Sequence, residues 1–378
     1  MKVFYWSPHY GNIATINAVK YSVDSLNKYS NSFYECRIIN AVGEWEDYVG
    51  SDYNLINLSN NNFYKIFPQF GYLSSRLFSL FVFIKCFFAL KKLIYREKPD
   101  FLIIHLITSL PLLLLVLFSF RTKFILRISG YPKLSIFRKS LWKLISNKIY
   151  IVTAPSMSTL NLLINKKIFS KEKVKLLNDP VFKIRSIIKL KKENCDFNVN
   201  KSNSYIVSIG RLTDQKNFKL LIDAFFFIKK KYPYYKLVII GDGEKKKTLL
   251  EQVKKLNLVN DIIFLGHVPN VYKYLNIADC FISTSLWEDP GFAIIESGIL
   301  NKMIISSDCP NSPNELLCDG QNGFLFKNNS KDDLLEKFDQ FKNEINQKIK
   351  LINAKKNFRK YSFFRHYSQI DKLLNNIN

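Results

Sequence analysis

Two glutamates eight positions apart, Glu288 and Glu296, are the side chains in this sequence whose types and spacing best suit chemistry. Glu288 follows an apolar, strand-like run, ADCFISTS, and precedes Pro290-Gly291, which predict a turn. Glu296 lies within the helix-like stretch FAIIESGIL. One carboxylate is therefore expected at the carboxyl end of a strand and the other in the next helix, which is where open α/β sheets bind ligands. Carboxylates in such places can accept hydrogen bonds from sugar or ribose hydroxyls.

Two basic residues, Arg211 and Lys216, follow the strand-like run SYIVSIG and precede a helical stretch. Two cations at a strand-to-helix junction would hold an anionic group, together with the backbone N–H groups of the helix start. The alternative is a pair of solvated charges, although basic residues are somewhat unfavourable at a helix N-terminus. Glu288 and Glu296 have similar alternatives, as a helix-capping carboxylate and a solvated helical charge.

Strand-like and helix-like segments alternate along the chain on both sides of these residues. This alternation predicts parallel sheets with right-handed crossovers, and hence an α/β fold of two facing Rossmann-like domains. We expect a first domain over residues 1–183 and a second over 204–355. Residues 184–203 are polar, charged and without clear periodicity, so they are expected to form a linker.

The apolar stretch 101–120 is long enough to span a bilayer. A buried strand–helix–strand unit accounts better for the turn and capping residues in and around this stretch. Pro99-Asp100 predicts a turn, Thr108 and Ser109 offer N-cap oxygens, and Pro111 suits a first helical turn. The helical stretch RLFSLFVFIKCFFALKKLIY can pack in the core or lie on a membrane surface, and packing is favoured.

The net charge and the cysteine content of the chain indicate which partners and which cellular compartment to expect. The net charge of +25 fits either a solvated lysine-rich surface or a basic face for anionic lipid or phosphorylated substrates. No nucleic-acid-binding signature accompanies it. Six scattered cysteines without a C-x-x-C pair predict neither a metal site nor disulfides and favour the cytoplasm. The N-terminus lacks the features of a signal peptide.

The ordered set GRLTDQKN, IIGDG, FLGHV, STSLWEDPGFAIIE, DCPNSPNELL and GQNGFLF, within residues 205–327, resembles the C-terminal domain of family 4 glycosyltransferases. These are retaining nucleotide-sugar enzymes of the GT-B fold. The N-terminal half resembles the family only loosely. The nearest likeness is to bacterial members of lipopolysaccharide O-antigen or capsule assembly. In this fold, residues 356–378 would form a helix that crosses back to the first domain.

The resemblance implies roles for individual residues. Arg211 and Lys216 would contact the donor diphosphate, Glu288 the donor sugar and Glu296 the ribose hydroxyls. The remaining donor-binding residues would be Gly210, Gly241, Asp242, Gly243, Gly291, Phe292 and Ala293. His105 would be the catalytic residue of the first domain, although it fits a buried, backbone-bonded histidine equally well. On the acceptor side we expect Gly11, Asn12 and Ser129, where many relatives have a Gly-Gly loop and a histidine instead.

The resemblance also implies an activity. The protein would transfer a sugar from a nucleotide-diphosphate donor to a glycan or lipid-linked acceptor with retention, without a metal ion or other cofactor. It would work as a peripheral protein on the inner face of the cytoplasmic membrane. A nucleotide-sugar epimerase or phosphorylase on the same fold is one alternative, and a non-catalytic sugar-nucleotide-binding partner is another.

Overall fold

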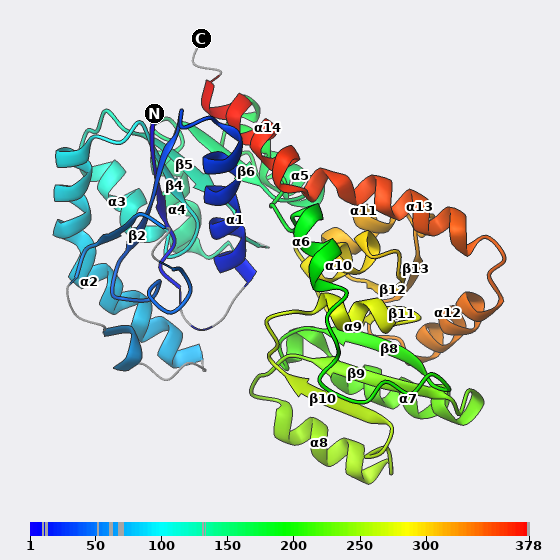
Figure 1. Cartoon of the computed structure of the whole chain (residues 1–378). Helices are drawn as coiled ribbons and strands as arrows, with labels where there is room; N and C mark the ends of the chain where they lie inside the picture. The colour runs from blue at the N-terminus through cyan, green and yellow to red at the C-terminus, as the bar shows by residue number, and fades with distance from the viewer. Residues whose placement is uncertain are drawn as a thin grey trace. The chain divides into compact units, whose positions relative to one another are not determined.

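The structure, a computed structural model, describes residues 1–9, 11, 14–50, 53–59, 63–66, 72–130, 132 and 134–375. Its chain divides into two compact units (Figure 1). Unit 1 combines Met1–Pro180 with Phe363–Asn378, and unit 2 is Val181–Ser362. Each unit contains one parallel sheet covered by helices, which confirms the α/β class with two parallel-sheet domains.

Unit 1 alternates strands and helices for most of its length. Its strands are β1 (Lys2–Trp6), β2 (Glu35–Asn40), β3 (Leu55–Asn57), β4 (Phe101–Ile104), β5 (Lys123–Arg127), β6 (Ile151–Ala154) and β7 (Val174–Leu176). Its helices are α1 (Ala14–Tyr29), α2 (Tyr72–Glu97), α3 (Ser109–Leu117), α4 (Ile136–Ile145), α5 (Met157–Asn165) and α14 (Phe363–Asn375), with short 3₁₀ turns at Phe63–Ile66 and Lys171–Lys173.

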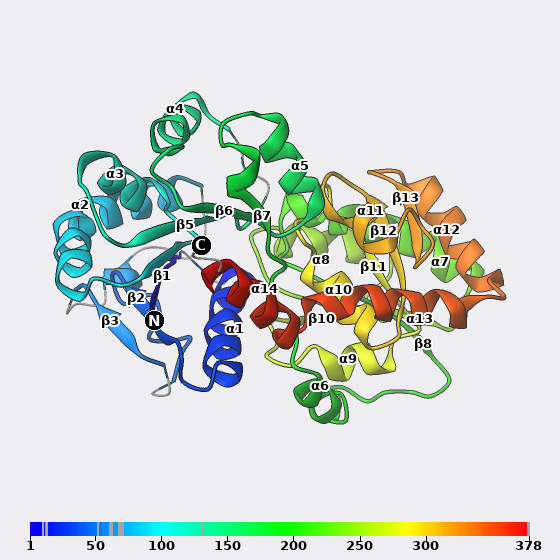
Figure 2. The ribbon, with the colours of Figure 1, turned by 90° about the horizontal axis from the view of Figure 1, so that it is seen from above.

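The sheet of unit 1 has the strand order β3-β2-β1-β4-β5-β6-β7, and every neighbouring pair is parallel. Its inner strands are buried on both faces, as their continuous apolar sequences require. One face packs against α2, α3 and α4 through a shared core, and the other packs against α1 and α14 (Figure 2). The strand order reverses direction between β1 and β4. The loops after these two strands therefore flank the crevice where sheets of this kind bind ligands.

The apolar stretch 101–120 forms β4 and α3, and β5 follows it. The expected buried strand–helix–strand unit is therefore confirmed. Leu110, Leu112 and Leu114 of α3 are fully buried. Among the residues that the structure describes, no helix combines the length and the apolar character needed to cross a bilayer.

Unit 2 repeats the alternation. Its strands are β8 (Ser204–Ile209), β9 (Tyr235–Ile240), β10 (Ile262–Gly266), β11 (Cys280–Ser283), β12 (Met303–Asp308) and β13 (Phe324–Lys327). Its helices are α6 (Ile184–Leu190), α7 (Phe218–Lys231), α8 (Lys246–Lys255), α9 (Tyr272–Ile277), α10 (Phe292–Ile299), α11 (Ser312–Leu317), α12 (Lys331–Asn343) and α13 (Gln347–Phe358), with 3₁₀ turns at Asp214–Lys216 and Arg359–Tyr361.

The sheet of unit 2 has the order β10-β9-β8-β11-β12-β13, again with all strands parallel. Helices α7, α8 and α12 cover one face, and α9, α10, α11 and α13 cover the other. The order reverses between β8 and β11. The loops after β8 and β11 therefore meet at the ligand-binding position of this sheet.

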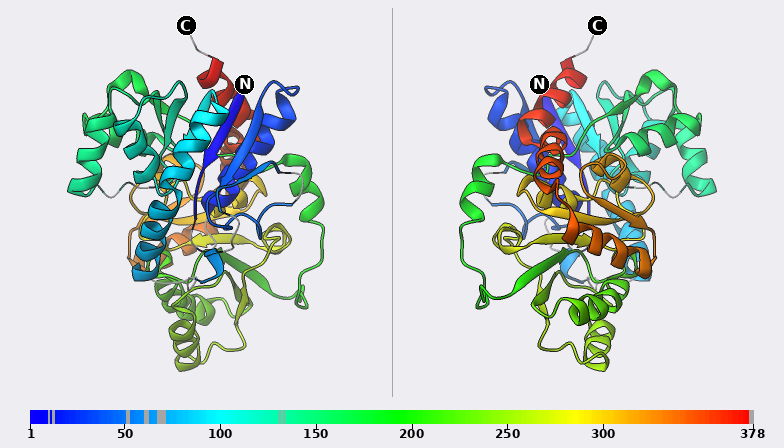
Figure 3. Two further views of the ribbon diagram at one scale, coloured as in Figure 1. Left: turned by 90° about the vertical axis from the view of Figure 1, so that its left-hand side faces the viewer. Right: turned by 90° about the vertical axis from the view of Figure 1, so that its right-hand side faces the viewer.

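Two segments differ in detail from the sequence-based outline. Residues 184–203, expected to be a linker, begin with helix α6, which buries Ile187. The C-terminal segment contains the end of α13 and a 3₁₀ turn before α14 begins at Phe363. Within unit 1, α14 lies beside α1 (Figure 3), where His366 Nε2 lies 2.8 Å from the hydroxyl of Ser22.

Candidate functional site: the strand ends of unit 2

The loop after β8 carries the basic pair. Gly210 directly follows the strand, and a Cβ at this position would lie 3.0 Å from the Lys216 side chain. The absence of a side chain at Gly210 therefore leaves room for the Lys216 side chain, which packs against this residue. Lys216 is mostly buried and forms an ion pair with Glu288. Arg211 is exposed, and its guanidinium lies 3.4 Å from the Gln215 side-chain oxygen.

Glu288 lies in the loop after β11 and is 7% exposed. Its Oε1 accepts a hydrogen bond from Ser285 Oγ at 2.7 Å and also receives the ammonium of Lys216. The backbone N–H of Glu288 lies 3.4 Å from the Pro310 carbonyl oxygen. These contacts hold the Glu288 carboxylate in place and give it the partners that a buried charge needs.

Helix α10 begins immediately after this loop. Its N-cap, Gly291, has φ = 86°, a conformation that favours glycine. A Cβ at Gly291 would lie 3.7 Å from Glu288 Cβ, so the helix start adjoins the carboxylate. The Gly291 carbonyl accepts from the amides of Ile294 and Ile295. The amides of Phe292 and Ala293 therefore precede the intrahelical bonds, as the first N–H groups of helices do, and such groups suit an anion.

Glu296 lies on the same helix and is half-buried. Burial raises its pKa to about 7, and a hydrogen bond from Tyr272 partly opposes this rise. The Tyr272 hydroxyl lies 3.1 Å from Glu296 Oε1. A carboxylate held in this way can accept hydrogen bonds from ligand hydroxyls once it is ionised.

The predicted Gly241–Gly243 turn follows β9 and crosses the loop after β8 at close range. A Cβ at Gly241 would lie 1.9 Å from the Gly210 carbonyl oxygen, and one at Gly243 would lie 2.6 Å from that of Leu212. Gly241 has φ = 140°. The side chain of Asp242 accepts from the Gly243 amide at 2.8 Å, and its bond with Lys246 lowers its pKa. The structure thus brings this turn against Gly210.

Candidate functional site: the strand ends of unit 1

His105 and Ser129 follow the neighbouring strands β4 and β5, and the structure places them together. His105 Nδ1 lies 3.2 Å from Ser129 Oγ, and the residue is 7% exposed. Burial, with a contribution from Arg127, holds the pKa of His105 well below its usual range, so the imidazole is neutral. His105 is buried, as the alternative interpretation also expected, and the partner of its ring is the Ser129 side chain.

Gly11 follows β1 and has φ = 68°. It is buried. Asn12, the other residue expected on the acceptor side, lies outside the residues that the structure describes. Because β1 and β4 flank the reversal of strand order, Gly11 and His105 belong to the ligand-binding edge of this sheet.

Several polar residues of these edges were not predicted from the sequence. Ser285, which binds Glu288, precedes it by three positions at the end of an apolar strand, and this S-x-x-E spacing was a usable signal. Tyr272 was missed because 24 residues separate it from Glu296. In unit 1, Arg127 and Asp179 form a buried ion pair beside His105. Their separation along the chain gives no local pattern.

His9 was also missed. It is 1% exposed, and its ring packs edge-on against Trp45 and Tyr48, with centroid distances of 4.8 and 5.0 Å. Burial lowers its pKa to about 4. Both aromatic residues come from the β2–β3 loop, so only the tertiary fold brings them to His9.

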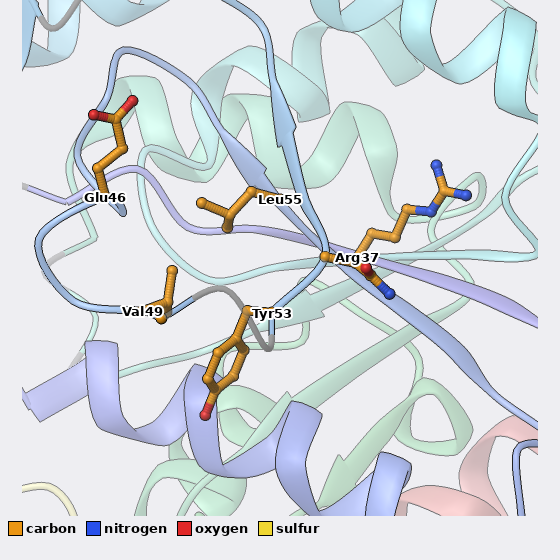
Figure 4. A pocket seen from close by; sticks show the side chains of 7 residues that line it. Arg37, Glu46, Val49, Tyr53 and Leu55 are labelled. Carbon is orange, nitrogen blue, oxygen red and sulfur yellow. The ribbon is translucent and has the colours of Figure 1, made fainter.

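A shallow cavity of about 560 Å³ lies elsewhere in unit 1 (Figure 4). It is lined by Arg37, Glu46, Val49, Gly50, Tyr53, Asn54 and Leu55. The guanidinium of Arg37 points away from Tyr53 and pairs with Glu35 and Glu97. None of the expected site residues that the structure describes lines this cavity. Within the described part of the chain, no cluster of three His, Cys, Asp or Glu could hold a metal ion.

Comparison with known proteins

Residues 191–358 match the family of glycosyl transferases group 1. This range lies within unit 2 and includes Arg211, Lys216, Glu288 and Glu296. The part of the chain that is similar to this family is therefore unit 2.

Several named relatives are also glycosyltransferases. The chain is 34% identical over 256 residues to an uncharacterized glycosyltransferase of Methanocaldococcus jannaschii, covering 63% of each protein. It is 28% identical over 277 residues to a Campylobacter jejuni protein, covering 72% of this chain and 73% of the relative. That relative is named GalNAc-alpha-(1->4)-GalNAc-alpha-(1->3)-diNAcBac-PP-undecaprenol alpha-1,4-N-acetyl-D-galactosaminyltransferase. The match to a second Campylobacter jejuni transferase, 36% identical, spans only 32% of either chain.

Solved structures resemble the whole chain. A glycosyltransferase from Rickettsia africae superposes with a TM-score of 0.75 at 16% identity, covering 100% of this chain and 99% of its own. HepE from Anabaena, solved with UDP and glucose, gives a TM-score of 0.73 at 17% identity, with both chains fully covered. At these identities the likeness concerns the fold, and it confirms the expected GT-B architecture.

Proposed function

We propose that this protein is a retaining glycosyltransferase that moves a sugar from a nucleotide-diphosphate donor to a glycan or lipid-linked acceptor. One observation carries the proposal. A lysine, a buried glutamate and the start of a helix adjoin one another at the strand-order reversal of unit 2. These groups suit the three parts of a sugar–diphosphate: its anionic phosphates, its hydroxyls and its leaving oxygen.

In the proposed complex, Arg211, Lys216 and the amides of Phe292 and Ala293 bind the diphosphate. Glu288 orients the sugar and Glu296 binds the ribose. The bond between sugar C1 and the phosphate oxygen breaks as the acceptor oxygen bonds to C1 from the same face. The acceptor proton passes to the departing phosphate oxygen. The cations and amides stabilise the negative charge on this leaving group, so the reaction needs no metal ion.

We assign the acceptor side to Gly11, Asn12, Ser129 and His105. His105 is neutral and would therefore bind or position an acceptor hydroxyl without adding charge. The names of several relatives support a role in cell-surface polysaccharide assembly, such as the O-antigen of lipopolysaccharide or a capsule. These include an amylovoran biosynthesis glycosyltransferase of Erwinia amylovora and the Campylobacter transferase named for its undecaprenol-linked glycan. We further propose that the protein works on the inner face of the cytoplasmic membrane.

A ligand screen by thermal unfolding tests the donor site. UDP, ADP and GDP would each be added to the wild type, Lys216→Ala, Glu296→Ala and the control Lys219→Ala, an exposed lysine of α7. At about 100 times Kd, a bound nucleotide stabilises by about 2.7 kcal/mol. We expect at least one nucleotide to stabilise the wild type and the control, and to stabilise both site variants much less. Equal stabilisation of all four proteins, or of none, would contradict the proposed donor site.

A further inference from the structure

Helix α2 is apolar on two opposite sides. Its inner side, with Phe78, Val82, Cys86 and Leu90, is buried against the sheet of unit 1. Its outer side carries a second apolar stripe, although it faces solvent. The stripe comprises Leu77, Leu80, Ile84, Phe88 and Tyr95, whose exposures run from 44% for Tyr95 to 74% for Phe88. At about 100° per residue, these five positions fall within an arc of about 80°.

Helices α3 and α4 extend this surface. In α4, Ile136 is 88% exposed, and Phe137 and Leu144 are also exposed. Leu117 is exposed at the end of α3. Helices α2, α3 and α4 pack on the same face of the sheet and share one buried core (Figure 2). The sides of these helices that face away from the sheet therefore lie on the same side of unit 1. We call these residues and the α2 stripe the outer apolar face.

Basic side chains accompany the outer apolar face. Residues 72–150 contain fourteen Lys and Arg, of which Arg127 is buried in an ion pair, but only two acidic residues, Glu97 and Asp100. Lys91, Lys92 and Arg96 of α2 line a shallow hollow together with Phe88 and Tyr95. Lys91 Nζ also lies 3.8 Å from the centre of the Phe118 ring. Apolar side chains beside long basic ones suit the interface of an anionic bilayer, where the rings enter the lipid and the ammonium groups meet the headgroups.

We propose that the outer apolar face docks unit 1 on an anionic lipid bilayer. The inference rests on the proposed transfer to a lipid-linked acceptor and names the surface that meets the lipid. The charge favours this partner over a second copy of the chain, because two such faces would bring like charges together. Ser129 precedes Ile136, the first residue of α4, by seven positions in the sequence. Docking would therefore bring the acceptor-side residue Ser129 near the headgroups.

Sedimentation with vesicles tests the docking. The vesicles would contain phosphatidylcholine alone or with phosphatidylglycerol, and the full chain would carry Ile84→Gln with Phe88→Gln, or Ile136→Gln with Phe137→Gln. Ile345→Gln in unit 2 is the matched control, because Ile345 is 94% exposed. Each pair should weaken binding to anionic vesicles by about tenfold or more. The control should bind like the wild type, and salt should weaken wild-type binding.

Three outcomes would overturn the inference. The first is no binding of the wild type to anionic vesicles, and the second is equal loss in the control and the paired variants. The third is that the wild type forms a dimer and that Phe88→Gln dissociates it. The outer apolar face would then join two copies of the chain. The nucleotide screen keeps the two proposals separate. UDP, ADP or GDP stabilisation without vesicle binding refutes the docking alone, whereas vesicle binding without nucleotide stabilisation refutes the donor site alone. The paired variants should keep the nucleotide response of the wild type.

Discussion

Lys216 and Glu288 neutralise each other in the ligand-free site. Ser285 adds a hydroxyl bond to the same carboxylate oxygen. An arriving diphosphate would compete with Glu288 for the ammonium, while the sugar hydroxyls would offer Glu288 new donors. Donor binding could therefore replace the Lys216–Glu288 ion pair by two contacts, one between Lys216 and the diphosphate and one between Glu288 and the sugar.

Lys216→Ala should weaken binding of the best nucleoside diphosphate by about tenfold to a hundredfold, the usual worth of a charge-assisted hydrogen bond. Titration calorimetry measures this effect. Lys219→Ala, in the next helix, should leave the affinity unchanged. A Lys216→Ala affinity within twofold of the wild type would mean that the lysine does not contact the phosphates.

Glu296 should make the site sensitive to pH. Its folded-state pKa of about 7 lies above the ordinary value of 4.5. Its stabilising contribution is therefore complete below about pH 4.5 and is lost as pH rises through about 7. The ligand-free wild type should lose thermal stability relative to Glu296→Gln across this window.

Nucleotide binding should respond to pH in the opposite direction. The ionised carboxylate is the better acceptor for ribose hydroxyls, so affinity should rise by up to about tenfold between pH 6 and 8. Glu296→Gln should remove this difference, because its amide does not titrate. Parallel pH profiles for the two proteins would show that Glu296 does not bind the ribose.

The sequence supplied Glu288, Glu296, Arg211 and Lys216 because strand ends are readable from local patterns. It did not supply the contacts that orient them. Tyr272 meets Glu296 only after two helices pack in unit 2, and Trp45 reaches His9 only after a long loop folds back. Side-chain partners separated along the chain leave no periodic signal.

At the scale of elements, α10 depends on α13. A Cβ on Gly298 would lie 1.9 Å from the ring of Phe358, which is fully buried. The close approach of these helices helps to fix the position of α10, whose first amides we propose as donor ligands. Helix α6 is one of the elements that were not predicted, because seven residues are too few for a clear helical period.

Gly298→Ala should destabilise the protein by about 1–3 kcal/mol, the usual cost of overpacking a core. Denaturant unfolding measures the change. Gly50→Ala is the matched control, because a Cβ there has no atom within 4 Å. The idea of a close-packed α10–α13 contact would fail if Gly298→Ala were as stable as the control.

At the scale of the molecule, unit 1 is built from both ends of the chain. His366 of α14 contacts Ser22 of α1 and the Asn178 carbonyl oxygen, at 2.8 and 2.7 Å. Tyr34 donates a hydrogen bond to Asp371 at 2.8 Å. Helix α14 is therefore part of the core of unit 1, and this unit is complete only after α14 has been synthesised.

Acidic pH should reveal how much the stability of unit 1 depends on the packing of α14. Burial lowers the pKa of His366 from 6.5 to about 3, so its contribution to stability is present above pH 6.5 and is lost as pH falls toward 3. At pH 5 the loss from this residue is about 2 kcal/mol at most. His366→Gln should therefore lose less stability than the wild type between pH 7 and 5 in thermal unfolding. Identical losses would show that another group governs the acid response.

The central claim, sugar transfer from a nucleotide donor, is tested most directly by mass spectrometry of the products. The wild type would be incubated with a panel of nucleotide sugars and a bacterial lipid extract, beside Glu288→Gln and the control Lys219→Ala. We predict a lipid-linked glycan heavier by one sugar, with an equal amount of nucleoside diphosphate released, in the wild type and the control but not in Glu288→Gln. A free, altered sugar without a glycosylated lipid, or the same products from all three proteins, would contradict the account.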